Sequence, residues 1–337
     1  MRKEASLEQW KALYEVTTRI KEMEPWERFW DMDIIGIRNG KEEDTAFISI
    51  LGHGGDCYGV VVYEGYEGWN KFLMLTMQEQ MNLSPRYAMF NQRNLTCYWG
   101  NRDELTDKQR KTIKELGYKY RGQNQWLYFV SYEPGYCPYN LDEAEVCRMT
   151  QYMKDLENAL QYYYEHGASV AFDRGNMFLA SFNEDKKAWQ FGEEPLPFTR
   201  FQFGTLEINR EEVQKALAGV PKNKMILEAD ICPMGASVAD KKYARPANPA
   251  LCLMTDSISE MIVACEITEP KDDPVIILAN QLMDFIFQCG VPKEIRVSNI
   301  IIEAGLSQIC DVCGIKIRRV KRLAKLESFV EGMHQYM

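Results

Sequence analysis

DPVIILANQLMDFIFQCGVPKEIRVSNIIIEAGLSQICDVCGIKIRRVKRLAKLESFVEGMHQYM, residues 273–337, is the most regular stretch of this chain. It opens with Asp273-Pro274, a capping side chain followed by a proline that fits the first helical position. The pattern then alternates, with a helix predicted over 275–288, a strand over 294–298, a helix over 300–313, a strand over 315–320 and a helix from 324 onward. Helices and strands alternating at this spacing predict right-handed crossovers on a parallel sheet.

The first of these helices, Val275 to Gln288, is apolar on almost every side. We therefore expect it to be buried all round, with Ile277 and Phe285 in the core. Three further strands are predicted upstream, at 225–231, 251–255 and 261–267, the last two joined by a turn over Asp256 to Glu260. Together these elements predict a C-terminal domain with a mixed sheet and crossover helices over residues 221–337.

The boundary of that domain is placed near Val220-Pro221, where the composition turns polar and the pattern restarts. Residues 1–220 are predicted to form an α+β module, so the whole chain is a two-domain α/β protein. Capping boxes at Ser6/Gln9 and Thr106/Gln109, and a third pair at Asn140/Glu143, predict three of its helices. Short strands are predicted at Ser169–Phe172, 177–182 and 188–191. The glycines of 52–56 favour a hairpin turn, with an anion site as the alternative.

The bulk composition narrows the class of protein. The net charge is −9 and the isoelectric point is near 5.2, which argues against general nucleic-acid affinity for the chain as a whole. No apolar run approaches the length of a membrane helix, and the N-terminus leads directly into an amphipathic pattern. We therefore expect a cytoplasmic protein, and we expect its ten cysteines to be thiols rather than disulfides. No cofactor is expected.

Two resemblances add to this reading. Pro25-Trp26-Glu27, the run Gly59 to Gly65 and Glu133-Pro134-Gly135-Tyr136 resemble a group of uncharacterised bacterial proteins built from domains of unknown function. That resemblance implies a class and no chemistry. The C-terminal third is similar to the ribonuclease-H-like fold, and most closely to integrase cores, through Glu228-Ala229-Asp230, the run Pro292 to Asn299 and the run Cys313 to Val320.

The ribonuclease-H-like resemblance implies three metal-binding carboxylates, at Asp230, at Ser298 and at Glu327. Ser298 is neutral, however, and two-metal phosphoryl transfer needs grouped anionic oxygens. We therefore interpret these three positions as vestigial, with no metal bound, and favour a non-enzymatic binding or regulatory protein. The alternative is a metal-dependent nuclease or phosphoryl-transfer enzyme that uses Asp230, Asp256 and Glu327.

Two other groups of residues are candidate binding sites. A basic cluster is either a docking surface for a protein or an anionic ligand, or the charged guard of an edge strand; its members are Lys316, Arg318, Arg319, Lys321 and Arg322, followed by Lys325. Cys310 and Cys313 form a Cys-x-x-Cys pair at the end of a predicted helix. Because no matching second pair of ligands accompanies them, we expect ordinary core or surface thiols.

Overall fold

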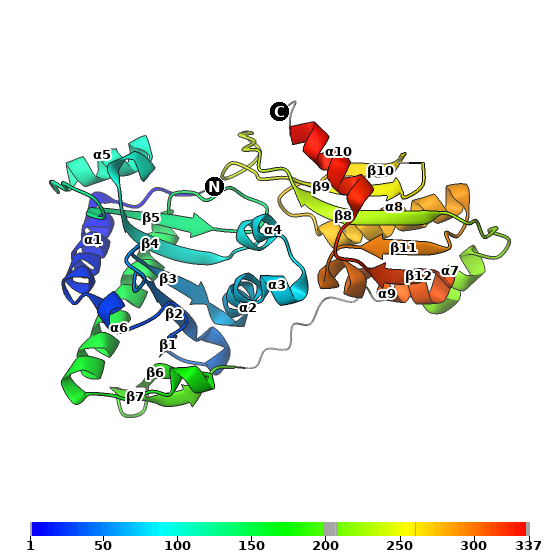
Figure 1. The fold of residues 1–337 in the computed structure, drawn as a ribbon. Helices are drawn as coiled ribbons and strands as arrows, with labels where there is room; N and C mark the ends of the chain where they lie inside the picture. The colour runs from blue at the N-terminus through cyan, green and yellow to red at the C-terminus, as the bar shows by residue number, and fades with distance from the viewer. Residues whose placement is uncertain (1, 198–205, 207, 260, 335–337) are drawn as a thin grey trace. The chain divides into compact units, whose positions relative to one another are not determined.

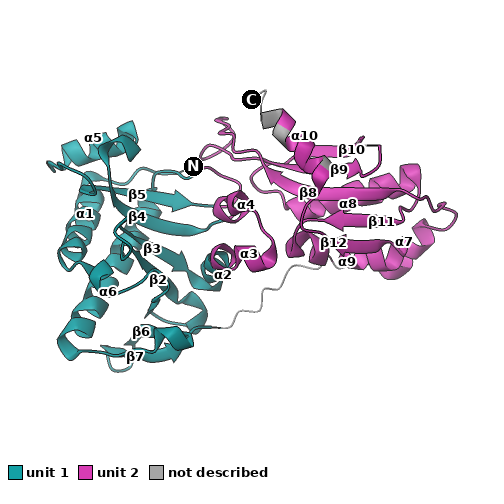
Figure 2. Cartoon of the chain, in the orientation of Figure 1, with its two compact units in different colours: residues 1–73, 92–133, 138–199 teal, residues 74–91, 134–137, 200–337 magenta. Residues whose placement is uncertain are grey.

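The computed structural model describes residues 2–197, 206, 208–259 and 261–334. The chain forms two compact units, which Figure 2 shows in different colours. The first consists of residues 1–73, 92–133 and 138–199, and the second of residues 74–91, 134–137 and 200–337. Among the described residues, no helix combines the length and the apolar character that a membrane span requires.

The first unit is built on a seven-stranded sheet with the order β5-β4-β3-β2-β1-β6-β7 (Figure 1). Neighbouring strands are antiparallel except β1 and β6, which are parallel. The strands are β1 (Ile35–Arg38), β2 (Ala46–Leu51), β3 (Gly59–Glu64), β4 (Asn94–Gly100), β5 (Trp126–Tyr132), β6 (Asn176–Asn183) and β7 (Ala188–Pro195). The β2–β3 pairing confirms the predicted glycine hairpin.

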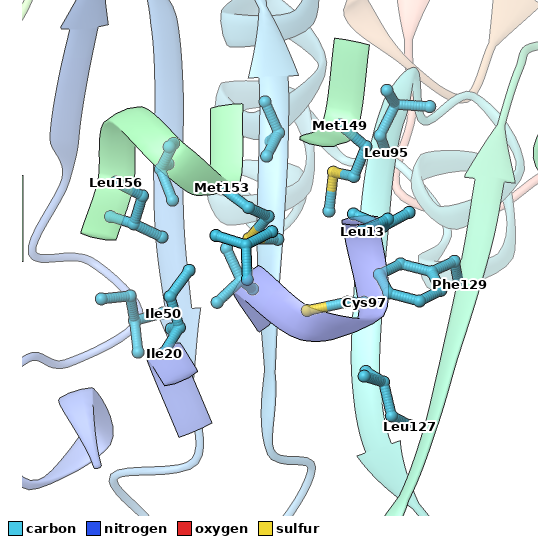
Figure 3. Packing of buried hydrophobic residues seen from close by; sticks show 14 of the residues in the cluster. Leu13, Ile20, Ile50, Leu95, Cys97, Leu127, Phe129, Met149, Met153 and Leu156 are labelled. Carbon is cyan, nitrogen blue, oxygen red and sulfur yellow. The ribbon is translucent and has the colours of Figure 1, made fainter. Parts of the chain in front are cut away.

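Helices cover both faces of this sheet. On one face, α1 (Leu7–Glu22) and α6 (Glu143–His166) share a core with alternate strand residues, and Figure 3 shows Leu13, Met153 and Cys97 within it. On the other face, Trp69 and Phe72 of α2 (Gly65–Thr76) pack with residues of β2, β3 and β6 and with Ile34, which precedes β1. Successive side chains of each strand point to opposite faces of the sheet, so both faces are buried where helices lie over them.

Two predicted capping boxes are confirmed and one is wrong. Ser6/Gln9 caps α1 and Thr106/Gln109 caps α5 (Asp107–Glu115). Helix α6 instead begins after Asp142, whose side chain accepts from the Glu145 N–H at 2.9 Å, so the box lies two residues later than Asn140/Glu143.

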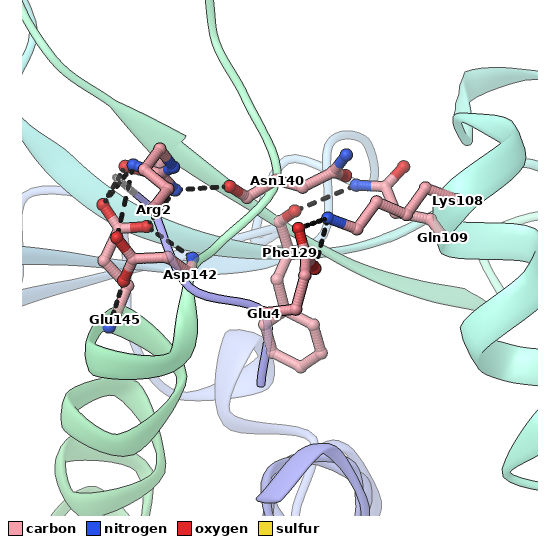
Figure 4. A network of polar contacts seen from close by, with 9 residues as sticks. Arg2, Glu4, Lys108, Gln109, Phe129, Asn140, Asp142 and Glu145 are labelled. Carbon is pink, nitrogen blue, oxygen red and sulfur yellow. Dashed lines mark hydrogen bonds and ion pairs between the residues drawn. The ribbon is translucent and has the colours of Figure 1, made fainter. Parts of the chain in front are cut away.

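Arg2 contacts the residues at the start of α6. Its guanidinium donates to the Glu145 carboxylate and to the Asn140 carbonyl, as Figure 4 shows. The Asn140 carbonyl is thereby engaged outside the helix.

The predicted strand at Ser169–Phe172 is also wrong, since this stretch is irregular and runs into a 3₁₀ turn at Phe172–Arg174. Short apolar runs do not distinguish strand from other structure.

The second unit is built on a five-stranded mixed sheet with the order β10-β9-β8-β11-β12. Its first three strands along the chain are antiparallel neighbours, and β8, β11 and β12 run parallel. The strands are β8 (Ile226–Pro233), β9 (Ala250–Asp256), β10 (Ile262–Ile267), β11 (Glu294–Val297) and β12 (Lys316–Arg319). This is the mixed sheet with crossover connections that the C-terminal pattern predicts, and it has the ribonuclease-H-like arrangement. The predicted 256–260 turn ends on Glu260, which lies outside the described residues.

Helices α8 (Pro274–Cys289) and α9 (Ile300–Cys313) share one core with this sheet, and α10 (Ala324–His334) packs through Leu326 against Leu251 and Leu253. Cys310 and Cys313 are buried free thiols in α9, as expected. The prediction that α8 is buried all round is wrong. Phe285 is 5% exposed, but Ile277 is only partly buried and Ile276 and Phe287 are 44% and 50% exposed. A helix that covers one face of a single sheet has an outer side.

Residues from well before the predicted boundary belong to the second unit. Helices α3 (Gln78–Met81) and α4 (Pro85–Phe90) and the turn between them carry Met81, Leu83 and Tyr87 into its core. Helix α7 (Arg210–Ala216) also lies in this unit. Around the predicted boundary near Val220-Pro221, the Val291 N–H donates to the Pro221 carbonyl at 2.8 Å and the Asn223 N–H donates back to the Val291 carbonyl at 2.9 Å. The stretch 221–223 is therefore paired with 291 rather than loosely connected.

Candidate functional site

A pocket of about 460 Å³ lies in the second unit at the carboxyl ends of β8 and β11. These strands are parallel neighbours, and the chain leaves them toward opposite edges of the sheet. Such a switch point in the strand order is where open α/β sheets bind their ligands. The walls come from both strand ends, from α10 and from residues 82–87. The lining residues are Asn82, Leu83, Ser84, Arg86, Tyr87, Asp230, Ile231, Cys232, Pro233, Ser298, Asn299, Lys321, Leu326, Glu327 and Val330.

Three polar side chains form a connected series at the base of this pocket. Val297 is paired with Ala229, so Ser298 lies beside Asp230. The Ser298 hydroxyl donates to the Asp230 carboxylate at 2.7 Å, and the Asn299 amide donates to the Ser298 hydroxyl at 3.0 Å. Asn299 also caps α9 by accepting from the backbone of Ile301 and Ile302. The structure thus brings Asp230 and Ser298 together, as the resemblance implies.

The Asp230 carboxyl group is held in an environment that favours its neutral form. Burial raises its pKa to about 6, with a smaller contribution in the same direction from Glu327. The hydrogen bonds from Ser298 and from the Ile231 N–H oppose that shift. A carboxyl group with this pKa carries less negative charge near neutrality than an ordinary aspartate does.

Glu327 faces the same pocket but is already engaged by its own chain. Its carboxylate accepts from the Arg322 guanidinium at 2.7 Å and from the Leu323 N–H at 3.2 Å. The second contact is the capping interaction of an acidic side chain at a helix start. Glu327 therefore neutralises Arg322 and orders the first turn of α10.

Asp256, the third residue of the alternative nuclease hypothesis, lies elsewhere. It is paired with Leu227 near the start of β8, whereas Asp230 is paired with Leu253. Its carboxylate accepts from the Ser259 hydroxyl at 2.6 Å and from the backbone N–H groups of Ser259 and Ile258. Burial raises the pKa of this carboxyl group, but the hydrogen bonds together outweigh burial and lower it. The structure does not bring Asp230, Asp256 and Glu327 to one place. Within the described part of the chain, no three His, Cys, Asp or Glu side chains are grouped closely enough to hold a metal ion.

The basic cluster lies on and after the edge strand β12. Three of its five members pair with carboxylates: Lys316 with Glu294 at 3.5 Å, Arg319 with Glu303 at 3.5 Å and Arg322 with Glu327. Arg318 and Lys321 are exposed and form no ion pair with any residue that the structure describes. Lys321 also lines the pocket. The side chain of Lys325 lies outside the described part.

Sequence reasoning missed Asn82, which joins the pocket from the first half of the chain. It ends α3 in the left-handed conformation, with φ at 54°. Its side-chain amide donates to the Ser298 carbonyl and, at 3.5 Å, to the Val320 carbonyl. Asparagine before Ser84-Pro85, a helix-start pair, is a local signal for a turn between two helices. Nothing local indicates which strands that turn contacts.

The second unit thus has a ribonuclease-H-like order of strands and a ligand-sized pocket, and no set of metal-binding carboxylates is assembled among the residues that the structure describes. A family model, "Domain of unknown function (DUF7309)", matches residues 10–180, and a second, "Domain of unknown function (DUF6930)", matches residues 213–334. Since the first match covers just over half of the chain, this protein belongs to the DUF7309 family. No curated protein matches the sequence.

Among solved structures, the catalytic core domain of BIV integrase is similar over 34% of this chain and 66% of that chain, with 10% identity and a TM-score of 0.25. The HTLV-2 integrase catalytic core domain in complex with magnesium is similar over 35% of this chain and 73% of that chain, with 16% identity and a TM-score of 0.24.

Proposed function

We propose that this chain is a cytoplasmic, non-enzymatic binding protein whose ribonuclease-H-like unit has kept the pocket and lost the catalytic set. The observation that carries the proposal is the hydrogen bond from the Ser298 hydroxyl to the Asp230 carboxylate. Where two-metal chemistry needs a second anionic oxygen, this position offers a hydrogen-bond donor. The donor set therefore does not fit a pair of divalent ions.

The other groups around the pocket support binding. The lining contains two basic side chains, Arg86 and Lys321, and two carboxyl groups, Asp230 and Glu327, beside the apolar Ile231, Leu326 and Val330. Convergent polar groups on a partly apolar wall are the usual make-up of a ligand site. The ten cysteines are all free thiols, which fits a reducing compartment.

The test is a cleavage assay on DNA and RNA across a titration of Mg²⁺ and Mn²⁺. It is run on the full chain, on Asp230→Ala and on Asp284→Ala, whose carboxylate is exposed on α8 and serves as the matched control. We expect no metal-dependent cleavage by any of the three. Cleavage that is lost in Asp230→Ala and kept in Asp284→Ala would instead establish the phosphoryl-transfer alternative.

We further propose that the partner of this unit carries negative charge and contacts Arg318 and Lys321. Both are exposed, and three carboxylates already balance the other members of the basic cluster. Heparin, used as a polyanionic probe, should bind the full chain less tightly in the Arg318→Glu/Lys321→Glu variant than in Lys316→Glu. If the native chain, the double variant and Lys316→Glu are retained equally at every salt concentration, the proposal fails, and the basic residues serve only to protect the edge strand β12 from pairing with another strand.

A further inference from the structure

The first unit contains a larger pocket, of about 810 Å³, whose lining residues all belong to that unit. It is bordered by the loop 55–58, by the 3₁₀ turn Arg102–Glu104 and by residues 138–140. Its size lies within the range of pockets that enclose small organic ligands. Of the sites considered from the sequence, only the glycine stretch 52–56 contributes to this pocket, through Gly55 and Asp56.

The alternation of β4 and β5 explains why tyrosines line this pocket. Leu95, Cys97, Leu127 and Phe129 enter the core beneath α1 and α6, so the residues between them point to the opposite face of the sheet. Tyr98 is paired directly with Tyr128, and their ring centroids lie 5.3 Å apart. Tyr132 adds a third ring, with its hydroxyl 3.2 Å from that of Tyr98.

An oriented carboxylate lies beside these rings. The Tyr128 hydroxyl donates to one Glu104 oxygen at 2.9 Å, and the Asn101 amide donates to the other at 3.0 Å. Each carboxylate oxygen can accept more than one hydrogen bond, so both retain acceptor capacity toward a ligand. Burial raises the pKa of Tyr98 and of Tyr128, so their hydroxyls stay neutral at ordinary pH.

Gly100 makes room for that carboxylate. A Cβ atom at this position would lie 2.1 Å from Glu104 Oε2 and 3.1 Å from Tyr128 Cε1. Any larger residue would therefore displace the Glu104 carboxylate from its place against the sheet. The glycine at position 100 is therefore what allows the Glu104 carboxylate to lie in this position.

The charge of the lining selects the ligand. Asp56 and Glu104 line the pocket, and no lysine, arginine or histidine is among its lining residues, all of which the structure describes. Electron-rich aromatic faces attract cations, and desolvation strengthens that attraction. We propose that this pocket binds an organic cation, with Glu104 as its counter-ion and the rings of Tyr98, Tyr128 and Tyr132 against its cationic group. This proposal is independent of the function assigned to the second unit.

The experiment compares each cation with a neutral isostere on the full-length protein. By isothermal titration calorimetry, the binding of choline is compared with that of 3,3-dimethyl-1-butanol, and the binding of n-butylammonium with that of n-butanol. Glucose is included because neutral sugars also stack on tyrosine rings. We expect at least one of the cations to bind about tenfold or more tightly than its isostere, as a cation–aromatic contact with a counter-ion predicts.

Variants assign the binding to this pocket. Glu104→Gln should weaken the cation about tenfold and leave the isostere unchanged, because it removes the charge and keeps the shape. Gly100→Ala should weaken it in the same sense while retaining the glutamate. Asp103→Asn, the neighbouring exposed carboxylate, is the matched control and should bind as the native chain does. Equal affinity for cation and isostere, binding of glucose alone, no binding of either cation, or cation binding that Glu104→Gln leaves intact would each overturn the proposal.

Discussion

Replacing Asp230 by asparagine should make the second unit less sensitive to rising pH. Burial raises the pKa of this carboxyl group from its ordinary value of 3.8 to about 6 in the folded chain. Between those two values the folded state therefore holds a proton that the unfolded state has released. Stability falls as the pH rises through this window, because the folded state binds more protons than the unfolded one. Asparagine keeps the acceptor for Ser298 and removes the titration.

The magnitude follows from the two pKa values. A pKa difference of about 2 corresponds to about 3 kcal/mol between the two ends of the window. Asp230 is only half-buried in the folded unit, and solvent screening reduces the effect, so we expect about 2 kcal/mol. The native chain should lose this amount between about pH 4 and pH 8 relative to Asp230→Asn. Asparagine also changes the strength of the hydrogen bond to Ser298, but this change is the same at every pH because asparagine does not titrate. The loss of stability in the native chain is therefore the main difference between the two proteins that depends on pH.

Urea unfolding at several pH values measures it. All seven tryptophans lie in the first unit, so their fluorescence reports that unit alone, whereas circular dichroism reports both. The pH-dependent difference should therefore appear in the circular dichroism transition and be absent from the fluorescence transition. Asp284→Asn, an exposed carboxyl group in the same unit, is the control. A variant whose stability relative to the native chain is the same at every pH would refute the reasoning.

Three further changes test the packing and the site. Phe285→Ala should lower the free energy of unfolding by about 3–5 kcal/mol, and Phe287→Ala, half exposed on the same helix, by less than about 1 kcal/mol; similar losses in urea unfolding would contradict the observed orientation of α8. Ser298→Asp should be less stable than the native chain without metal and should gain thermal stability with Mg²⁺, since it places a second carboxylate beside Asp230. A melting temperature that does not respond to Mg²⁺ would count against that account. Asn82→Gly keeps the left-handed backbone and removes the amide, so it should cost about 1 kcal/mol and Asn82→Ala more; equal stability of the two variants in urea would show that the backbone conformation does not matter there.

The C-terminal half of the fold could be predicted because its signals are local. Asp273-Pro274 and Asn299 cap their helices, Gly290 and Gly314 end them, and the strands that follow them, β11 and β12, are short. These cues determine the order of helices and strands, and right-handed crossovers then leave few arrangements of the sheet. The outer side of α8 was not predicted, because the sequence shows Ile276 and Phe287 as apolar without showing that they have no partner.

The candidate site could be predicted only in part. Asp230 and Ser298 follow from strand ends that the ribonuclease-H-like resemblance aligns, and the structure places them in contact. The contact of Asn82 with Ser298 spans more than two hundred residues and has no local signature. The tyrosine pocket was missed because Tyr98, Tyr128 and Tyr132 read as strand residues with no indication that one face of β4 and β5 is open.

The membership of residues 74–91 in the second unit has a consequence for synthesis. During translation this segment is made some 135 residues before β8 begins at Ile226, and its apolar Met81, Leu83 and Tyr87 have no native core to enter until then. At about 5–20 residues per second, a ribosome needs roughly 7–27 s to reach β8. Over that interval the nascent chain presents an unpaired apolar segment between two stretches of a unit that can already be folding. That segment is where a chaperone that recognises exposed apolar residues would find this protein during its synthesis.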